Sequence, residues 1–243
     1  IQQEAKRHGI VAFSSNYALY ADLSNRVVEV LSQFSPSIEV YSIDESFLEL
    51  SGFKRFGYQA YGAEIRQRIA DWLGLAVCVG IGPTKTLAKL ANHAAKKNLA
   101  GRGGVCDFLS MKPEDLKQLM AGIPVGEVWG VGRKISARLE DMGIATALQL
   151  READAETIRT RFSVVLERTV RELRGISCLE LEEVVPDKQQ IMCSRSFGSL
   201  VYDLAELEEA VASYIGRAAE KLRAQDALAG ALQVLIRTNI FKP

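Results

Sequence analysis

The sequence of 243 residues has few of the side chains that build disulfide-bonded or metal-bound cores. It contains four cysteines and two histidines. The cysteines are scattered and form no C-x-x-C pair, so we expect free core thiols in a reducing compartment rather than a zinc site or disulfides. No run of about 18 uncharged apolar residues occurs, and no basic segment followed by an apolar one opens the chain. We therefore predict a cytoplasmic protein with no membrane partner.

The sequence also lacks a net charge, which by itself argues against a nucleic-acid binder, because neutralising phosphates requires Lys and Arg. The charge is unevenly distributed, however. Residues 85–138 hold ten Lys and Arg against four Asp and Glu, whereas residues 140–187 hold six against eleven. A zero total is therefore compatible with a basic face. Such asymmetry also arises by chance, so it indicates nucleic-acid binding only together with other features.

The hydrophobic pattern of the first 109 residues alternates between helix and strand. A hydrophobic content of 48% is ordinary for a folded protein, and the length allows one large domain or two to three small ones. Helices are expected at 1–9, 16–34, with Ser15 as a plausible N-cap, and 58–73, ending at Gly74. Strands are expected at 10–13, 37–43, 47–50, 75–81 and 105–109. This alternation fits an α+β fold with a ferredoxin-like split βαβ sheet and helices on one face.

Two adjacent carboxylates, Asp44 and Glu45, lie where two of these short strands meet. Adjacent side chains of a strand face opposite ways, so a tight turn is needed for both to aim at one point. Binding of a hard cation requires such convergence. The simpler interpretation is a hairpin tip capped by solvated acids, because Asp-Glu pairs are common on surfaces.

The stretch after the strand at 75–81 begins with glycines and continues as a helix. It superficially resembles a phosphate loop, but Pro83 and Thr84 precede Lys85, so the Gly-Lys-Ser/Thr order is absent and that interpretation fails. The helix has a basic face, formed at near four-residue spacing by Lys85, Lys89, His93 and Lys96. Its apolar face is formed by Leu87, Leu90, Ala91 and Ala94. A solvated lysine face is the simpler interpretation of this pattern.

Residues 110–179 show short helical patterns and no strand pattern. Helices are expected at 113–120 and 132–142, with more up to about Gly175. Between the first two, Gly130-Val131-Gly132 follows Trp129 and precedes Arg133 and Lys134, an arrangement that resembles a helix-hairpin-helix. Glycines let the backbone approach a phosphate, and free N–H groups at a helix N-terminus favour an anion. The basic pair favours sequence-independent phosphate binding over a plain helix connection.

The acidic segment 180–189 contains Pro186 and has little periodicity, so we predict a linker. Beyond it, the patterns indicate a strand at 191–197, an amphipathic helix at 204–224 and a strand at 228–240. A strand, a helix and a strand make only part of a domain.

The motifs together resemble those of the Y-family, or translesion, DNA polymerases. Residues 41–50, 79–91 and 128–134 look like the second catalytic motif and the next two signatures of that family, in the same order. Residues 13–17 and 193–198 narrow the match to the UmuC/MucB/ImpB branch, the catalytic subunits of bacterial mutagenic polymerases. The resemblance covers almost the whole chain.

The resemblance implies several domains. They are a remnant of the fingers at 1–10, an incomplete catalytic palm at 11–109, a helix-hairpin-helix thumb at 110–179, a linker at 180–189 and the first half of a little finger at 190–243. The complete little finger of the family is a four-stranded βαββαβ module that lies on duplex DNA.

The resemblance also implies residue roles. Asp44 and Glu45 are then catalytic metal ligands, and Lys96 holds the incoming triphosphate. The implied DNA contacts are Lys85, Lys89, Gly130, Gly132, Arg133, Lys134, Ser194, Arg195 and Ser196, although a strand edge is the simpler interpretation of the last three singly. Two divalent ions serve nucleotidyl transfer in the family, and carboxylate, phosphate and water oxygens favour Mg²⁺.

The expected substrates are primer-template DNA and a dNTP. By resemblance, the partners are a UmuD-like subunit, the sliding clamp and the recombinase filament. The expected role is error-prone translesion synthesis in SOS mutagenesis and DNA repair.

The chain departs from the family pattern at its N-terminal end. The family has another metal-binding aspartate on an early strand, followed by fingers with nucleotide-contacting Tyr and Arg residues and a steric gate against ribose. No position here matches them, and Asp22, in a helical pattern, is no substitute. No Met opens the sequence, so we expect a fragment. An incomplete carboxylate set predicts weak metal binding and low activity for the chain as written.

Two other classes of function remain open. One is a non-catalytic DNA-binding protein derived from such a polymerase, which keeps the helix-hairpin-helix and the basic face. The other is an unrelated metal-dependent phosphohydrolase or nucleotidyl cyclase on the same kind of sheet. The second explains Asp44 and Glu45 but leaves the hairpin at Gly130 and the partial last domain without a role.

Overall fold

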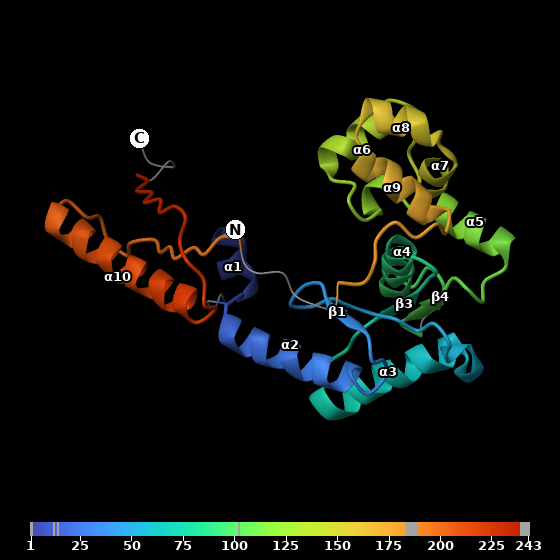
Figure 1. Cartoon of the computed structure of the whole chain (residues 1–243), viewed down its shortest axis with the longest axis horizontal. Coiled ribbons are helices and arrows are strands. Elements are labelled where there is room, and N and C mark those ends of the chain that lie inside the picture. The colour runs from blue at the N-terminus through green and yellow to red at the C-terminus, as the bar shows by residue number, and fades with distance from the viewer. Residues whose placement is uncertain (1, 12, 14, 102, 183–188, 239–243) are drawn as a thin grey trace. The chain divides into compact units, whose positions relative to one another are not determined.

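The computed structural model of the chain describes residues 2–11, 13, 15–101, 103–182 and 189–238 (Figure 1). The chain divides into two compact units, 1–185 and 186–243. This division falls within the predicted linker, of which 183–188 lie outside the described residues. The mixture of helices and short strands confirms the predicted α+β class.

The N-terminal end begins with a short helix, α1 (Gln2–His8). The strand predicted at 10–13 is wrong: Ile10, Val11 and Phe13 have no regular structure, and Ala12 lies outside the described residues. The three described side chains are 62–88% exposed. Within the described part, nothing pairs with this segment, and an apolar run becomes a strand only when a neighbouring strand accepts its hydrogen bonds.

Two helices follow the predicted pattern closely. Helix α2 (Tyr17–Leu31) is capped by Asn16, whose side chain accepts a hydrogen bond from a backbone N–H of the first turn, and not by the predicted Ser15. A short 3₁₀ turn, η1 (Phe53–Phe56), precedes α3 (Tyr58–Leu73). The bounds of α3 are those predicted, and Gly74 ends it in the left-handed conformation.

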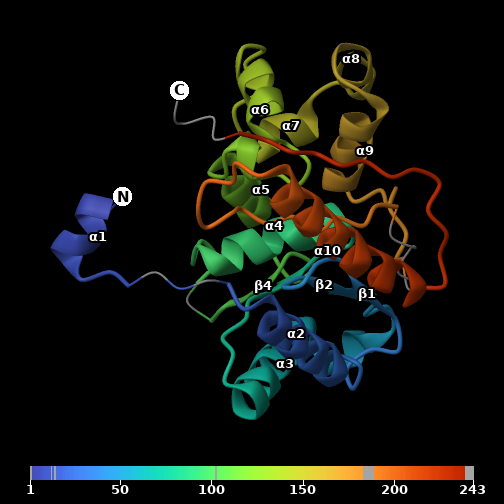
Figure 2. The ribbon, with the colours of Figure 1, turned by 90° about the vertical axis from the view of Figure 1, so that its left-hand side faces the viewer.

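The first two strands form a hairpin. Strands β1 (Ile38–Val40) and β2 (Ser46–Leu48) pair antiparallel, with Glu39 opposite Phe47. They confirm the predicted hairpin but are shorter than expected. Helices α2 and α3 pack beside each other, as Figures 1 and 2 show, and Ile38 and Leu48 of the hairpin pack against the core that they form. The buried residues of this first core are Val30, Leu31, Phe34, Ile65 and Ile69.

A βαβ unit follows, in which β3 (Val79–Ile81), α4 (Lys85–Lys96) and β4 (Val105–Asp107) place the two strands parallel. Gly80 faces α4 so closely that a Cβ there would lie 2.0 Å from the backbone nitrogen of Asn92. The opposite face of the same strands contacts α3. Helices therefore cover both faces of this sheet, and the prediction of helices on one face is wrong. The cause is the alternation along β3, where a glycine lies between Val79 and Ile81.

The four strands do not form the single ferredoxin-like sheet that was predicted. Among the described residues, β1 pairs only with β2 and β3 only with β4, so two separate two-stranded sheets result. Within the described part, no further strand shares hydrogen bonds with both pairs.

The rest of the first unit is helical. Its helices are α5 (Pro113–Ala121), a 3₁₀ turn η2 (Val125–Glu127), α6 (Arg133–Glu140), α7 (Ala147–Glu152), α8 (Ala155–Arg161) and α9 (Val164–Leu173). Residues 110–179 are all described and contain no strand, as predicted. The apolar face of α4 packs into the same second core as these helices. That core therefore crosses the predicted palm–thumb boundary, which stays a prediction.

The second unit contains α10 (Leu204–Arg223), which confirms the predicted helix at 204–224. The strands predicted at 191–197 and 228–240 are wrong for every described residue, and residues 239–243 lie outside the described part. Neither segment has a strand partner there, and an isolated strand is not stable in water. In the part of the chain that the structure describes, no helix has both the length and the apolar character needed to cross a lipid bilayer.

Candidate functional site

The turn between β1 and β2 brings Asp44 and Glu45 to one exposed corner. The backbone N–H groups of Tyr41 and Ser42 both donate to the carbonyl oxygen of Glu45, at 3.1 and 3.0 Å. The Ser42 hydroxyl donates to an Asp44 carboxylate oxygen at 2.7 Å, which holds that carboxylate within the turn. The predicted tight turn is therefore present, and both carboxylates remain exposed.

A cavity of about 1030 Å³ lies beside this turn within the first unit. Asp44 and Glu45 line it together with Lys89 and Lys96, and residues of both β2 and β3 contribute to its wall. The structure thus places the two predicted metal ligands and the predicted triphosphate-binding lysine around one cavity. Lys96, the last residue of α4, is exposed.

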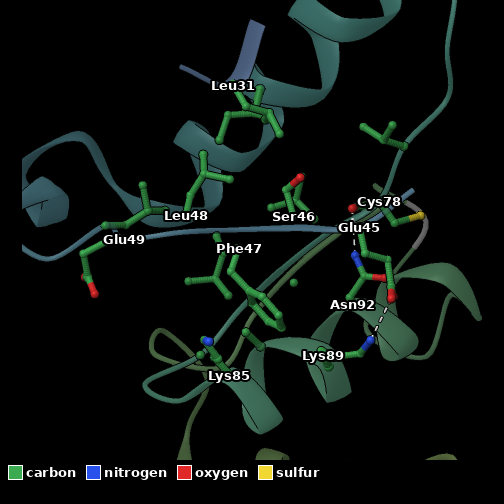
Figure 3. A pocket seen from close by; sticks show the side chains of 18 of the residues that line it. Leu31, Glu45, Ser46, Phe47, Leu48, Glu49, Cys78, Lys85, Lys89 and Asn92 are labelled. Atoms are coloured by element: carbon green, nitrogen blue, oxygen red, sulfur yellow. Dashed lines mark hydrogen bonds and ion pairs between the residues drawn. The ribbon is translucent and has the colours of Figure 1, made fainter. Parts of the chain in front are cut away.

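Glu45 is linked to helix α4 by an ion pair. Its Oε2 lies 2.8 Å from Nζ of Lys89, which donates a hydrogen bond to it (Figure 3). The structure places the ammonium group of Lys89 against a candidate metal ligand, and the predicted contact of Lys89 with DNA stays a prediction.

Aromatic rings surround the same ammonium group. Lys89 Nζ lies 4.7 Å from the ring centroid of Tyr41 and 5.2 Å from that of Trp129. The indole N–H of Trp129 donates to the Tyr41 hydroxyl at 3.1 Å, and the ring of Phe47 lies 5.8 Å from each of the other two. Tyr41 and Phe47 belong to the hairpin, whereas Trp129 precedes the glycines of the helical part. These three rings are called the aromatic cluster below.

Lys85, the first residue of α4, is nearly buried. Its Nζ donates to the Glu39 carboxylate and, at 2.5 Å, to the carbonyl oxygen of Glu180. The backbone N–H of Glu182 donates to the same Glu39 carboxylate at 2.7 Å. A contact between Lys85 and DNA would require this network to open, and the predicted contact stays a prediction.

A second buried carboxylate, Glu172 on α9, links the start of α4 to the segment after α9, residues 176–182, which also contains Glu180 and Glu182. It is fully buried and accepts backbone N–H bonds from Thr86, Cys178 and Leu179, at 3.0, 2.7 and 3.2 Å. Buried carboxylates need such donors, because an unpaired buried charge is very costly.

The predicted helix-hairpin-helix is present between α5 and α6. Gly130 has a φ of +86°, a conformation that glycine adopts without strain, and Gly132 is the N-cap residue of α6. Arg133 and Lys134 occupy the first two positions of that helix and are exposed. Free N–H groups and two cations therefore face solvent at this turn, as phosphate binding requires.

The remaining predicted residues lie elsewhere. Ser194, Arg195 and Ser196 are exposed in an irregular segment of the second unit. Asp22 forms an ion pair with Arg26 on α2 at 3.0 Å and does not line the cavity.

The carboxylates of the turn fit a hard divalent ion in donor chemistry, since Asp44 and Glu45 offer exposed oxygens on one cavity. They are only two, and among the described residues no three His, Cys, Asp or Glu side chains gather into a metal-binding group. The other ligands of such an ion would have to come from phosphates and water.

The structure adds two residues that the sequence analysis did not single out, Glu39 and Glu172, and one contact that it did not foresee, between Tyr41 and Trp129. Local pattern gives no sign of Glu39 or Glu172 being buried. Tyr41 and Trp129 belong to the motifs at 41–50 and 128–134, but nothing in either motif indicates that the two side chains meet.

The fold is that of the Y-family DNA polymerases. A Y-family chimera of Dbh and Dpo4 matches with a TM-score of 0.59 at 20% identity, over 85% of this chain and 58% of that one. DinB from Sulfolobus solfataricus matches with a TM-score of 0.54 at 22% identity, over 71% of this chain and 50% of the other.

Within that class, the chain belongs to the impB/mucB/samB family. The model of that family matches residues 2–93, its C-terminal domain model matches 188–242, and its helix-hairpin-helix model matches 113–144. Protein UmuC of Salmonella typhimurium is 50% identical over 99% of this chain and 57% of its own length. Protein MucB of Escherichia coli is 46% identical over 97% of this chain and 56% of its own length. The chain thus spans little more than half of these relatives.

Proposed function

We propose that this chain is part of an error-prone translesion DNA polymerase of the UmuC type, which adds nucleotides to a primer opposite a template. The observation that carries the proposal is the shared cavity, in which Asp44 and Glu45 face the helix that ends at Lys96. Family membership supports the same conclusion.

The proposed roles follow from charge and position. Asp44 and Glu45 would hold divalent ions, for which we propose Mg²⁺, and Lys96 would bind the triphosphate. Lys96 follows Lys89 by seven residues, or about 10 Å along α4, which leaves room for phosphates between the two ends. When bound, the ions would activate the primer 3′-hydroxyl and neutralise charge on the triphosphate.

The helix-hairpin-helix would hold the DNA backbone. Arg133 and Lys134, with the free N–H groups after Gly132, suit a backbone phosphate whatever the base sequence of the DNA. We propose that Ser194, Arg195 and Ser196 of the second unit add backbone contacts, and that Lys85 does so only if its pairing opens. Sequence specificity is not needed, because the template directs the incoming nucleotide.

Lower metal affinity is expected from the two-carboxylate site alone. Residues of both β2 and β3 line the cavity, and we propose that the further strand of the family pattern would bring another aspartate to it. We therefore propose that this chain is weakly active by itself. We also propose the family's role in SOS mutagenesis, a cytoplasmic location, and contacts with a UmuD-like subunit, the sliding clamp and the recombinase filament.

Primer extension tests the proposal. The chain, its Asp44→Asn variant, and a version extended N-terminally to an upstream start codon would be assayed on an undamaged template and on one with a single abasic site. We expect elongation chiefly by the extended version, and its loss with Asp44→Asn. DNA binding would be measured alongside at two salt concentrations.

The main alternative is a DNA-binding protein without catalysis. It would be favoured if the extended version binds DNA in a salt-sensitive way but never elongates a primer. The family models and the relatives named above support a polymerase rather than an unrelated phosphohydrolase or cyclase.

A further inference from the structure

Lys89 is the point at which three parts of the first unit meet. Its ammonium group contacts Glu45 of the hairpin turn, Tyr41 at the start of that turn and Trp129 of the helix-hairpin-helix. Only 20% of its side chain is exposed, against 47% for Glu45. A lysine held in this way is not a mobile surface charge.

The aromatic cluster fixes where that ammonium group can lie. The rings of Tyr41 and Trp129 meet edge to face, with centroids 5.3 Å apart and an angle of 89° between them. The hydrogen bond from the indole N–H to the Tyr41 hydroxyl locks this arrangement. Ring faces attract a cation, and the attraction strengthens as water is excluded. The ammonium group of Lys89 is therefore held by two rings as well as by the Glu45 carboxylate.

We propose that Lys89 is a positioning residue for Glu45, and that the ammonium group caged by Tyr41 and Trp129 occupies the carboxylate until a divalent ion displaces it. This inference rests on the proposed function only in taking Glu45 as a cation ligand. An ammonium group and a metal ion compete for the same oxygens and repel each other at short range.

The cage, meaning the rings of Tyr41 and Trp129 around the Lys89 ammonium group, also connects the candidate metal site at Glu45 with the helix-hairpin-helix. Trp129 directly precedes Gly130, so DNA that alters the helix-hairpin-helix alters one wall of the cage. Any effect of DNA on the metal affinity at Glu45 must be matched by an equal effect of metal on DNA affinity, because coupling between binding sites is reciprocal.

Mn²⁺ alone is a suitable probe, since the free ion can be counted by electron paramagnetic resonance in the absence of DNA and nucleotide. We expect Lys89→Met to bind Mn²⁺ about three- to tenfold more tightly than the unmodified chain, because the competing charge is gone. In a Glu45→Gln background, Lys89→Met should have no such effect. This double-mutant cycle isolates the Lys89–Glu45 interaction.

Lys97→Met is the matched control. It removes the same charge from an exposed position about 12 Å further along the helix axis. We expect less than a twofold change, because exposed charges at that separation are largely screened. An equal gain from both variants would mean that general electrostatics, and not position, is responsible.

The cage has its own test. Trp129→Leu should also tighten Mn²⁺ binding, by less than Lys89→Met does. Trp129→Phe keeps a ring but loses the N–H donor to Tyr41, so its effect should lie between that of Trp129→Leu and the unmodified value. In a Trp72→Phe background, Mg²⁺ should shift the emission of Trp129, and Glu45→Gln should abolish the shift. Far-UV circular dichroism verifies the fold of each variant, and Lys89→Gln replaces Lys89→Met if the latter does not fold.

The proposal is overturned if Lys89→Met and Lys89→Gln bind Mn²⁺ no more tightly than the unmodified chain, or if their gain persists without Glu45. Failure of primer extension would contradict the polymerase proposal and leave these binding results intact, so the two failures are distinguishable.

Discussion

Helices α4 and α10 have the same kind of amphipathic sequence, yet only one of them is buried. The apolar side of α4 lies entirely within the second core, and Leu90, Ala91 and Ala94 are at most 2% exposed. No residue of α10 is buried. An apolar stripe thus predicts a helix and its inward face, but burial depends on partners elsewhere in the chain.

The contrast extends to the units in which the helices lie. The first unit contains two cores, buried carboxylates with full sets of donors, and a βαβ sheet covered on both sides. The described part of the second unit exposes large apolar side chains such as Leu228, at 97%, and Tyr202, at 88%. Packing therefore contributes more to α4 than to α10, as far as the described residues show.

The largest expected difference between the two helices is the loss of stability on truncating one apolar side chain in each, by Leu90→Ala in α4 and Ile215→Ala in α10. Leu90 is 2% exposed, and we expect its truncation to lower the free energy of unfolding by about 2–5 kcal/mol through the cavity left behind. Ile215, half-buried on α10, should cost less than about 1 kcal/mol. Urea denaturation followed by circular dichroism measures both. Equal losses would show that the apolar face of α10 is covered after all.

Thiol reactivity gives a second contrast, between Cys106 of β4 and Cys193 of the second unit. Burial, with a contribution from the Asp107 carboxylate, raises the pKa of Cys106 to about 11 from 9.0. At pH 8 its thiolate fraction is then about a hundredfold smaller than that of an ordinary thiol, and it rises as the pH approaches 11. Peptide mapping after iodoacetamide treatment should find Cys193 modified first. Equal rates at pH 8 would mean that the core around β4 opens readily.

Glu172→Ala should destabilise the chain by about 2 kcal/mol, because one buried and two part-buried N–H groups lose their acceptor. Glu208→Ala, on the exposed side of α10, should stay within about 0.5 kcal/mol of the unmodified chain. Thermal denaturation compares the two. A neutral Glu172→Ala would mean that water replaces the carboxylate and that the segment after α9 is not held by it.

The last comparison is between two pairs of cationic residues, one in the helix-hairpin-helix and one at the end of α10, by their effect on DNA affinity. Replacing Arg133 and Lys134 together by Ala should weaken binding to a labelled duplex about tenfold and flatten the slope of log affinity against log salt by about 2. Replacing Lys221 and Arg223, at the end of α10, serves as the control and should change little. Fluorescence anisotropy at about 50 and 200 mM salt is sufficient. Equal effects of the two pairs would contradict a specific role for the helix-hairpin-helix.

Helix positions were predictable from the sequence where strong periodicity ended at a clear stop. Helix α3 ends at Gly74 as expected, and α4 (Lys85–Lys96) contains the lysines that the spacing placed on one helix. The irregular structure at 191–197 and 228–238 was not predictable from the sequence. Both segments have a strand pattern, but a strand also needs a partner, which the pattern does not specify.

The candidate site was predictable only in its local parts. The tight turn at Asp44 follows from neighbouring residues. The contact between Trp129 and Tyr41 joins residues 88 positions apart, and Glu39 is buried because Lys85 and the N–H of Glu182 reach it from distant segments. Alternation at Ile38 and Val40 gives no hint of such partners.

The close approach of α4 to β3 also limits how this chain can vary. Every amino acid other than glycine carries a Cβ, and at position 80 that atom would meet the backbone of α4 at 2.0 Å and 2.3 Å. Backbone atoms cannot rotate away as a flexible side chain can. Any missense change of this codon must therefore displace the helix that bears Lys89 and Lys96, even though Gly80 itself has no chemical role. Only glycine, whose side chain is a single hydrogen atom, therefore fits at position 80. The geometry of the site depends on keeping this residue, although it takes no part in the chemistry.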